Sequence, residues 1–120
     1  MDKTSIQSNL HLFDEEAREL LGECATKPQV VIVGGSAFVL MGQTDRATHD
    51  IDVLSLPNGL GELIKQYGMN LDVAAYSDCL PYNYEDRLIA LDIGDCYLEY
   101  LVPSLEDLVV MKLYGYETLI

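Results

Sequence analysis

The N-terminal residues 1–27 carry a helical pattern of apolar positions. Hydrophobic side chains recur at steps of three and four residues, at Leu10, Phe13, Ala17, Leu20, Leu21 and Cys24. Charged residues fill most of the positions between them, so the segment predicts an amphipathic helix with one apolar face. Lys27 and Pro28 follow this helix, and proline is expected to stop it because it has no backbone N–H to donate.

A continuous apolar run over residues 29–33 comes next and is rich in valine and isoleucine. Such a run is typical of a strand that is buried on both faces. Gly34 and Gly35 close this strand. The following patterns predict, in chain order, a helix over 36–42, a strand over 50–54, a short helix over 60–67 and a strand over 71–76.

The last third of the chain has the pattern of a hairpin followed by a helix. Apolar segments over 88–93 and 96–102 flank Gly94 and Asp95, a pair typical of a tight turn between antiparallel strands. Ser104 stands three residues before Asp107 and predicts the capped start of a final helix that runs to residue 113. We therefore expect one α/β (α+β) domain over residues 1–120, with a small mixed β-sheet flanked by helices.

The charge balance narrows the classes of function. The chain has 7 Lys and Arg against 20 Asp and Glu, a net charge of −13, and is nonetheless 49% hydrophobic. An acidic disordered tail would lack this apolar content, and a broad phosphate-binding surface would need clustered basic residues. No long apolar segment or signal peptide is evident, so we expect a cytoplasmic protein without membrane contact. Cys24, Cys79 and Cys96 have neither disulfide-framework nor zinc-site spacing and are expected to be buried free thiols.

Candidate chemistry concentrates between residues 30 and 54. Gly34 and Gly35 allow the backbone to approach a ligand, and the helix that begins at Ser36 offers unpaired N–H groups and a hydroxyl to a triphosphate. Asp50 and Asp52 alternate along a predicted strand, so their carboxylates should face the same side. Two aligned carboxylates are suitable ligands for Mg²⁺ in phosphoryl or nucleotidyl transfer.

This order of a strand, Gly34-Gly35-Ser36, a helix and Asp50-Ile51-Asp52 resembles the signature of the polymerase-β-type nucleotidyltransferase superfamily. The segments 46–52, 83–88 and 105–113 are similar to those of small bacterial nucleotidyltransferase-like proteins related to the AbiEii abortive-infection toxins. The resemblance implies a minimal nucleotidyltransferase fold that holds an NTP at the glycine turn and Mg²⁺ on the two aspartates. It also implies transfer of an NMP to a hydroxyl of RNA or protein, in a toxin–antitoxin or phage-defence setting.

Two further site residues follow from the resemblance. The superfamily uses a third carboxylate as the base for the incoming hydroxyl; we assign it to Asp72 on the next predicted strand, with Glu99 as the alternative. Lys112 on the last helix is the candidate cation for the triphosphate. Related proteins continue into further helices, and we expect this C-terminal extension to be absent. The apolar ending at 117–120 then suggests a homodimer or a cognate partner protein.

Two other interpretations remain at this stage. A strand, a Gly-Gly turn, a helix and a strand with acidic residues also occur in dinucleotide-binding Rossmann-like domains, although Gly34-Gly35-Ser36 lacks the usual Gly-x-Gly-x-x-Gly spacing. The other alternative is a nucleotidyltransferase fold that has lost its activity and serves as an interaction module.

Overall fold

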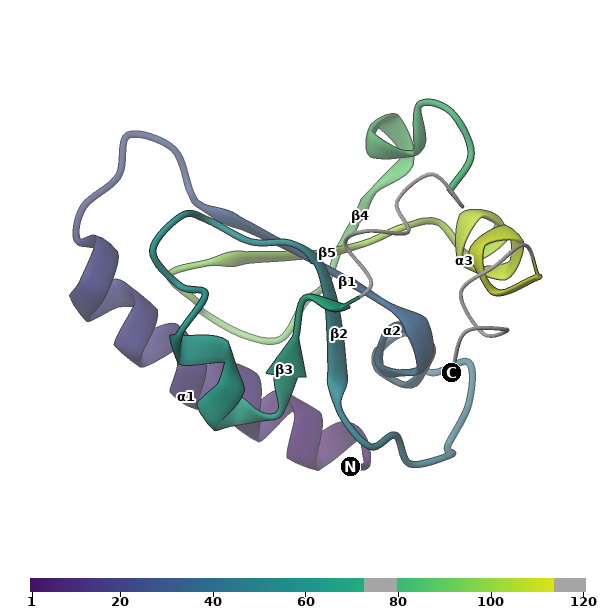
Figure 1. Ribbon diagram of the computed structural model, residues 1–120, viewed down its shortest axis with the longest axis horizontal. Coiled ribbons are helices and arrows are strands. Elements are labelled where there is room, and N and C mark those ends of the chain that lie inside the picture. Colours follow the sequence, from purple (N-terminus) through teal and green to yellow (C-terminus); the bar gives the residue numbers. More distant parts are fainter. Residues whose placement is uncertain (73–79, 114–120) are drawn as a thin grey trace.

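The computed structural model describes residues 1–72 and 80–113, and in this part of the chain a five-stranded sheet is flanked by helices (Figure 1). The elements in chain order are α1 (Lys3–Leu21), β1 (Gln29–Val33), α2 (Gly34–Leu40), β2 (Ile51–Ser55), the 3₁₀ helix η1 (Leu63–Tyr67), β3 (Met69–Asn70), the 3₁₀ helix η3 (Tyr84–Arg87), β4 (Ile89–Ala90), β5 (Glu99–Val102) and α3 (Leu105–Met111).

The sheet is mixed, as the sequence predicts. Its strand order is β3-β2-β1-β5-β4. The parallel pairs are β1 with β5 and β2 with β3, whereas β1 with β2 and β4 with β5 are antiparallel. A dinucleotide-binding domain would need β1 and β2 to run parallel. The antiparallel pairing of these two strands therefore contradicts the Rossmann-like alternative, and the fold is a small α+β domain.

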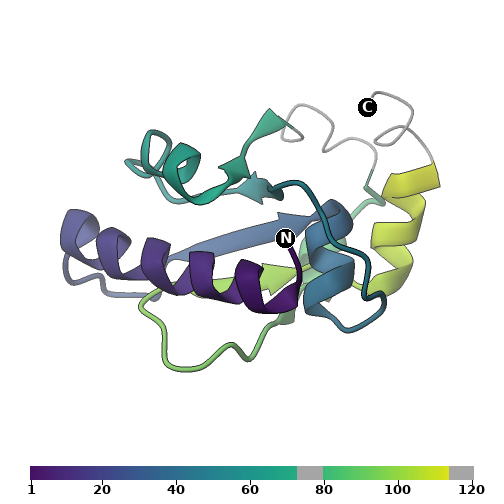
Figure 2. The same ribbon diagram turned by 90° about the horizontal axis from the view of Figure 1, so that it is seen from below.

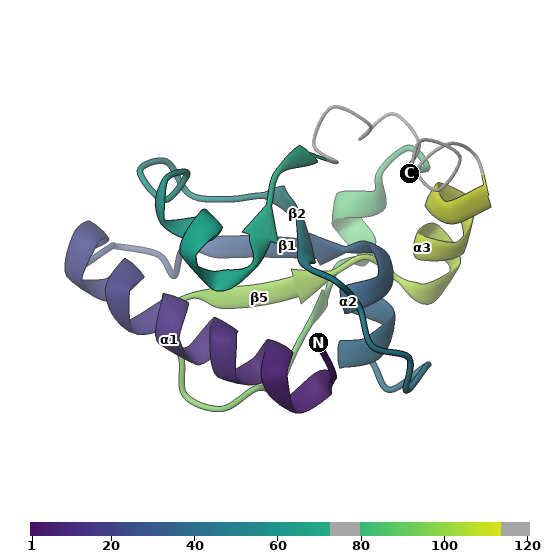
Figure 3. The same ribbon diagram turned by 60° about the horizontal axis from the view of Figure 1, so that its bottom comes forward.

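Helix α1 covers the sheet with part of its predicted apolar face: Leu20 is 61% exposed, and Cys24 is exposed and lies beyond the helix. Ile6, Leu10, Phe13 and Ala17 are fully buried. Figures 2 and 3 show the helix lying lengthwise against β1 and β5. The Asp2 side chain caps the start of the helix by accepting a hydrogen bond from the Ser5 backbone N–H at 2.8 Å. The predicted end at Lys27 and Pro28 is wrong: the helix ends at Leu21, where Gly22 adopts a φ of 66° and its N–H donates to the Arg18 carbonyl.

A buried carboxylate fastens α1 to the segment before β5. Asp14 accepts hydrogen bonds from the backbone N–H groups of Tyr97, at 2.7 Å, and Leu98, at 2.9 Å. The Tyr100 hydroxyl donates to the same side chain at 3.2 Å. Burial, together with the charge of Asp14, raises the pKa of Tyr100 well above its ordinary value, which keeps this hydroxyl protonated as a donor.

The predicted hairpin is confirmed in its pairing but is wrong in its turn. β4 pairs antiparallel with β5, yet residues 91–98 separate them instead of a two-residue turn at Gly94 and Asp95. The backbone N–H groups of Tyr97 and Leu98 are bonded to the Asp14 side chain, so they are not available for a strand ladder.

The third strand is also displaced from its predicted position. β3 occupies Met69–Asn70, whereas the pattern predicts a strand over 71–76. Leu71 and Asp72 come after the strand, and residues 73–76 lie outside the described part. The N–H of Ile51 donates to the carbonyl of Gly68 at 2.7 Å, which draws the segment from Gly68 onward against β2.

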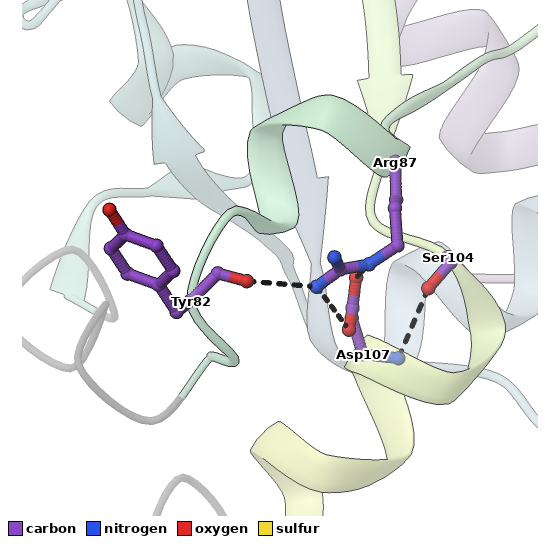
Figure 4. A network of polar contacts seen from close by, with 4 residues as sticks. All are labelled: Tyr82, Arg87, Ser104 and Asp107. Atoms are coloured by element: carbon purple, nitrogen blue, oxygen red, sulfur yellow. Dashed lines mark hydrogen bonds and ion pairs between the residues drawn. The ribbon is translucent and has the colours of Figure 1, made fainter.

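The predicted cap of the last helix is confirmed. The Ser104 hydroxyl accepts a hydrogen bond from the Asp107 backbone N–H at 3.2 Å. The Asp107 carboxylate is buried and accepts two hydrogen bonds from the Arg87 guanidinium, at 2.9 and 3.1 Å (Figure 4). The same guanidinium donates to the Tyr82 carbonyl at 3.3 Å, so one arginine links the 82–87 segment to α3. The Arg87 contact is the main reason why the pKa of Asp107 is lowered.

The cysteines differ from the expected buried thiols. Cys24 is exposed and Cys96 is half-buried, and both are free; Cys79 lies outside the described residues. The Cys24 thiol lies 3.2 Å from the Tyr97 hydroxyl, beyond the end of α1. No helix within residues 1–72 and 80–113 is long and apolar enough to cross a membrane.

Candidate nucleotide and metal site

The two aspartates of the Asp-x-Asp motif face the same side of the sheet. Asp50 directly precedes β2 and Asp52 is its second residue, so the predicted strand over 50–54 is shifted by one residue. A single side-chain amide contacts both carboxylates: Asn70 Nδ2 donates to Asp50 Oδ2 at 2.9 Å and to Asp52 Oδ1 at 3.0 Å. The alternation of the motif thus yields the convergent pair that the sequence predicts.

The electrostatics of this pair are those of crowded negative charge. Asp52 is half-buried and its pKa is raised from 3.8 to about 6. Burial is the largest cause, and the negative charges of Asp50 and Asp72 add to it, whereas the hydrogen bond from Asn70 acts in the opposite direction. A cation placed at these carboxylates would relieve the repulsion.

The glycine turn begins beside Asp52. Val33, the last residue of β1, is in register with Asp52 on β2, and Gly34 follows immediately. Gly34 has a φ of 70°, a left-handed conformation that other residues adopt only with strain. A Cβ on Gly35 would lie 3.4 Å from Thr48 Oγ1, and the same Thr48 hydroxyl donates to the Asp50 carbonyl at 3.1 Å. The two glycines and the aspartates therefore form one corner of the domain.

Ser36 takes a different orientation from the one expected of a phosphate ligand. Its side chain is fully buried, and its hydroxyl donates to the Val33 carbonyl at 3.0 Å. In this conformation the hydroxyl stabilises the turn between β1 and α2. The binding of an NTP by Gly34, Gly35 and Ser36 stays a prediction, and for Ser36 it requires rotation of the hydroxyl.

The structure separates the two candidates for the third carboxylate. The Asp72 backbone N–H donates to Asn70 Oδ1 at 3.1 Å, and its charge acts on the pKa of Asp52. Glu99 is instead in register with Gln29 at the start of β1, whereas Asp52 is in register with Val33 at its end. Four residues of strand correspond to about 13 Å. The structure thus brings Asp72 to the aspartate pair and leaves Glu99 at the other end of the sheet.

Lys112 lies against the helix that follows the glycine turn. It stands at the C-terminal cap of α3, and its Nζ is 5.7 Å from the ring centre of Phe38 on α2. This contact places the ammonium group on the α2 side of α3. Its role as a triphosphate ligand stays a prediction.

Sequence reasoning missed Asn70, which is the residue that joins the site together. Its amide contacts both aspartates and the Asp72 backbone, but an asparagine before a turn has no signature of its own in a sequence. The only available signal was its position two residues before Asp72. Its pairing with Asp52 across β2 and β3 is set by the tertiary register.

The donor set fits a magnesium ion held in part by substrate. Within residues 1–72 and 80–113, no group of three or more His, Cys, Asp and Glu side chains is placed to hold a metal ion. Mg²⁺ is commonly bound by one or two carboxylates, with waters and substrate phosphates completing its shell. Asp50 and Asp52 supply two such hard oxygen ligands, and the pKa of Asp52 is raised first by burial and then by the neighbouring charges of Asp50 and Asp72.

Comparison with known proteins tests whether the chain is a member of the nucleotidyltransferase superfamily. A family described as "Nucleotidyltransferase of unknown function (DUF6036)" matches residues 8–118, which is nearly the whole chain. No curated protein and no solved structure matches. The match supports the nucleotidyltransferase superfamily that the motifs indicate, while the closer relationship to the AbiEii toxins stays a prediction. The chain belongs to this family of nucleotidyltransferases of unknown function.

Proposed function

We propose that the domain is a Mg²⁺-dependent nucleotidyltransferase that moves an NMP from an NTP to a hydroxyl of RNA or protein. The observation that carries the proposal is the convergence of Asp50 and Asp52 beside the glycine turn, within 3.0 Å of one shared amide nitrogen. Family membership supports a transferase. A toxin–antitoxin or phage-defence setting is part of the proposal and rests on the sequence resemblance alone.

Different residues bind the phosphates, hold the metal ion and accept the proton in the proposed reaction. The backbone at Gly34 and Gly35 receives the phosphates of the NTP, with the Lys112 ammonium as counter-charge. Asp50 and Asp52 hold Mg²⁺, which when bound supplies positive charge against the charge that develops on the phosphates. The acceptor hydroxyl attacks the α-phosphorus, its proton passes to the Asp72 carboxylate, and the bond to the α,β-bridging oxygen breaks to release pyrophosphate.

A transfer assay with position-specific labels tests this reaction. The protein is incubated with Mg²⁺, total cellular RNA or protein, and each of the four NTPs labelled at either the α- or the γ-phosphate. Transfer of an NMP incorporates the α label and never the γ label, whereas a kinase would incorporate the γ label. We expect Asp52→Asn to abolish incorporation and Asp45→Asn, an exposed residue in the same segment, to leave it unchanged.

The result that contradicts the proposal is equally specific. Wild-type protein that incorporates no α label from any NTP into either acceptor is not a nucleotidyltransferase of this kind. Incorporation that persists undiminished in Asp52→Asn would remove the carboxylate pair from the chemistry.

A second candidate function is a nucleotidyltransferase fold that acts only as an interaction module. The inward orientation of Ser36 favours it, because the hydroxyl expected to meet the phosphates is bonded to the Val33 carbonyl. A module of this kind would bind no NTP in the presence of Mg²⁺. Titration calorimetry with each NTP therefore separates the two functions without knowledge of the acceptor.

A further inference from the structure

We propose that Asn70 is a positioning residue that holds the carboxylates of Asp50 and Asp52 in their convergent arrangement and connects them to Asp72. The inference rests on the proposed function, in which these carboxylates bind Mg²⁺. It assigns a role to a residue that carries no reactive group and that neither motif of the sequence includes.

The first step is the use of the amide hydrogens. A side-chain amide nitrogen carries two hydrogens, and Asn70 directs one to Asp50 Oδ2 at 2.9 Å and one to Asp52 Oδ1 at 3.0 Å. Two carboxylates that both lie within 3.0 Å of one nitrogen repel each other. A neutral group with two donors can bond to both without adding a charge. The amide therefore opposes the separation of the pair in the metal-free protein.

The second step is the orientation of the amide itself. Its oxygen accepts a hydrogen bond from the Asp72 backbone N–H at 3.1 Å. A flipped amide would place its NH₂ group against that N–H and its oxygen against two carboxylates, so the network selects the observed orientation. The two amide hydrogens and the amide oxygen of Asn70 are thus all bonded, and together they fix the side chain in one orientation.

The third step is the placement of Asn70 in the sheet. Asn70 is in register with Asp52 in the parallel pair of β2 and β3, and β3 is a two-residue strand at the edge of the sheet. So short an edge strand has few ladder bonds of its own. The side-chain amide supplies the additional connection between the Asp-x-Asp strand and the segment that carries Asp72.

Metal affinity distinguishes positioning from a merely structural role. Residues that orient metal ligands typically contribute 10–100-fold to metal affinity. We expect Asn70→Ala to weaken Mn²⁺ binding, measured by titration calorimetry without nucleotide, by about tenfold or more. The matched control is Asn9→Ala, since Asn9 is also half-buried and donates from its amide to the Tyr67 carbonyl at 3.0 Å. This control should lower Tm and leave the Kd for Mn²⁺ unchanged within twofold.

A second measurement tests the positioning without any metal. In EDTA at pH 8, Asn70→Ala should lower Tm by about 5 °C in the wild-type background, because two charge-assisted hydrogen bonds are lost. In the background of Asp50→Ala with Asp52→Ala, the same substitution should change Tm by less than half as much. The nearly isosteric Asn70→Leu keeps the volume, has no donors and adds no charge, so it removes the same hydrogen bonds and keeps the test valid if the alanine variant folds poorly.

Each outcome has a definite meaning. Equal Mn²⁺ affinity in wild type and Asn70→Ala overturns the positioning role. The positioning role is also overturned if Asn70→Ala lowers Tm equally in the wild-type background and in the background of Asp50→Ala with Asp52→Ala. Should wild-type protein bind no Mn²⁺, the proposed function loses its metal site, while the metal-free comparison still decides whether Asn70 holds the carboxylates.

Discussion

Asp52 carries its charge at a cost in folding stability, and the isosteric substitution Asp52→Asn measures that cost. The amide oxygen of the new side chain can still accept the hydrogen bond that Asn70 donates to Asp52 Oδ1. The substitution therefore removes the charge and keeps this hydrogen bond. Functional sites commonly retain such destabilising groups, so the same variant that loses activity should fold more stably.

The magnitude follows from the pKa. The pKa of Asp52 is raised from 3.8 to about 6, mainly by burial. The difference between these values corresponds to about 3 kcal/mol against the charged form. Solvent screens a half-buried group, so we expect Asp52→Asn to raise the free energy of unfolding at pH 8 by about 1–2 kcal/mol.

The stabilisation by Asp52→Asn should depend on pH in a characteristic way. The folded state binds the Asp52 proton more tightly than the unfolded state, because the folded pKa is the higher of the two. The stability that this group contributes is therefore present below pH 3.8, falls as the pH rises through about 6, and is lost above that. The gain from Asp52→Asn should be largest at pH 8 and about half as large at pH 5.

Urea unfolding followed by circular dichroism in EDTA, at pH 5 and pH 8, provides the assay. Both values stay above the isoelectric point of about 4.2. Asp45→Asn removes one charge from an exposed position and controls for the change in net charge; it should alter stability by less than about 0.5 kcal/mol. The reasoning is refuted if Asp52→Asn is no more stable than wild type at pH 8, or if its gain is the same at both pH values.

Three further substitutions test the scaffold around the site, each by urea unfolding at pH 7. Asp14→Ala should cost about 3 kcal/mol, because the backbone N–H groups of Tyr97 and Leu98 lose their acceptor, while the Tyr100 hydroxyl keeps the Leu10 carbonyl at 3.1 Å; a cost below 1 kcal/mol would show that water replaces the carboxylate. Asp107→Asn should cost about 1–2 kcal/mol through the loss of the bidentate ion pair. This cost should shrink as the pH falls below 4, since the pKa of Asp107 is lowered in the folded protein; an unchanged cost at low pH would contradict the ion pair. Gly34→Ala should cost about 1–2 kcal/mol from its φ of 70°, whereas Gly61→Ala, with open space around it, should be near neutral; equal costs would contradict the strain.

The parts of the fold that the sequence predicted are those decided by local patterning. The apolar face of α1, the buried strand β1 and the cap at Ser104 each depend on a few neighbouring residues. The shared side of Asp50 and Asp52 follows in the same way from the alternation along a strand. For these features the local prediction and the tertiary structure agree, except that Leu20, predicted on the apolar face of α1, is exposed.

The features that the sequence did not predict depend on partners far along the chain. Asp14 stands beside Glu15 and Glu16 in an acidic stretch, and only donors some 83 residues away make its burial favourable. These contacts in turn prevent the tight hairpin expected at Gly94. Asn70 acquires its role only through its register with Asp52, which no property of the residue itself indicates.

The central claim is that Asp50 and Asp52 form a metal-dependent NTP site, and calorimetric titration of the four NTPs with and without Mg²⁺ tests it most directly. We predict that at least one NTP binds the wild-type protein in the presence of Mg²⁺. This binding should be lost when Mg²⁺ is omitted, and it should also be lost in the Asp50→Ala and Asp52→Ala double variant. The claim is contradicted if no NTP binds wild-type protein in Mg²⁺, or if binding is the same without the ion or without the two carboxylates.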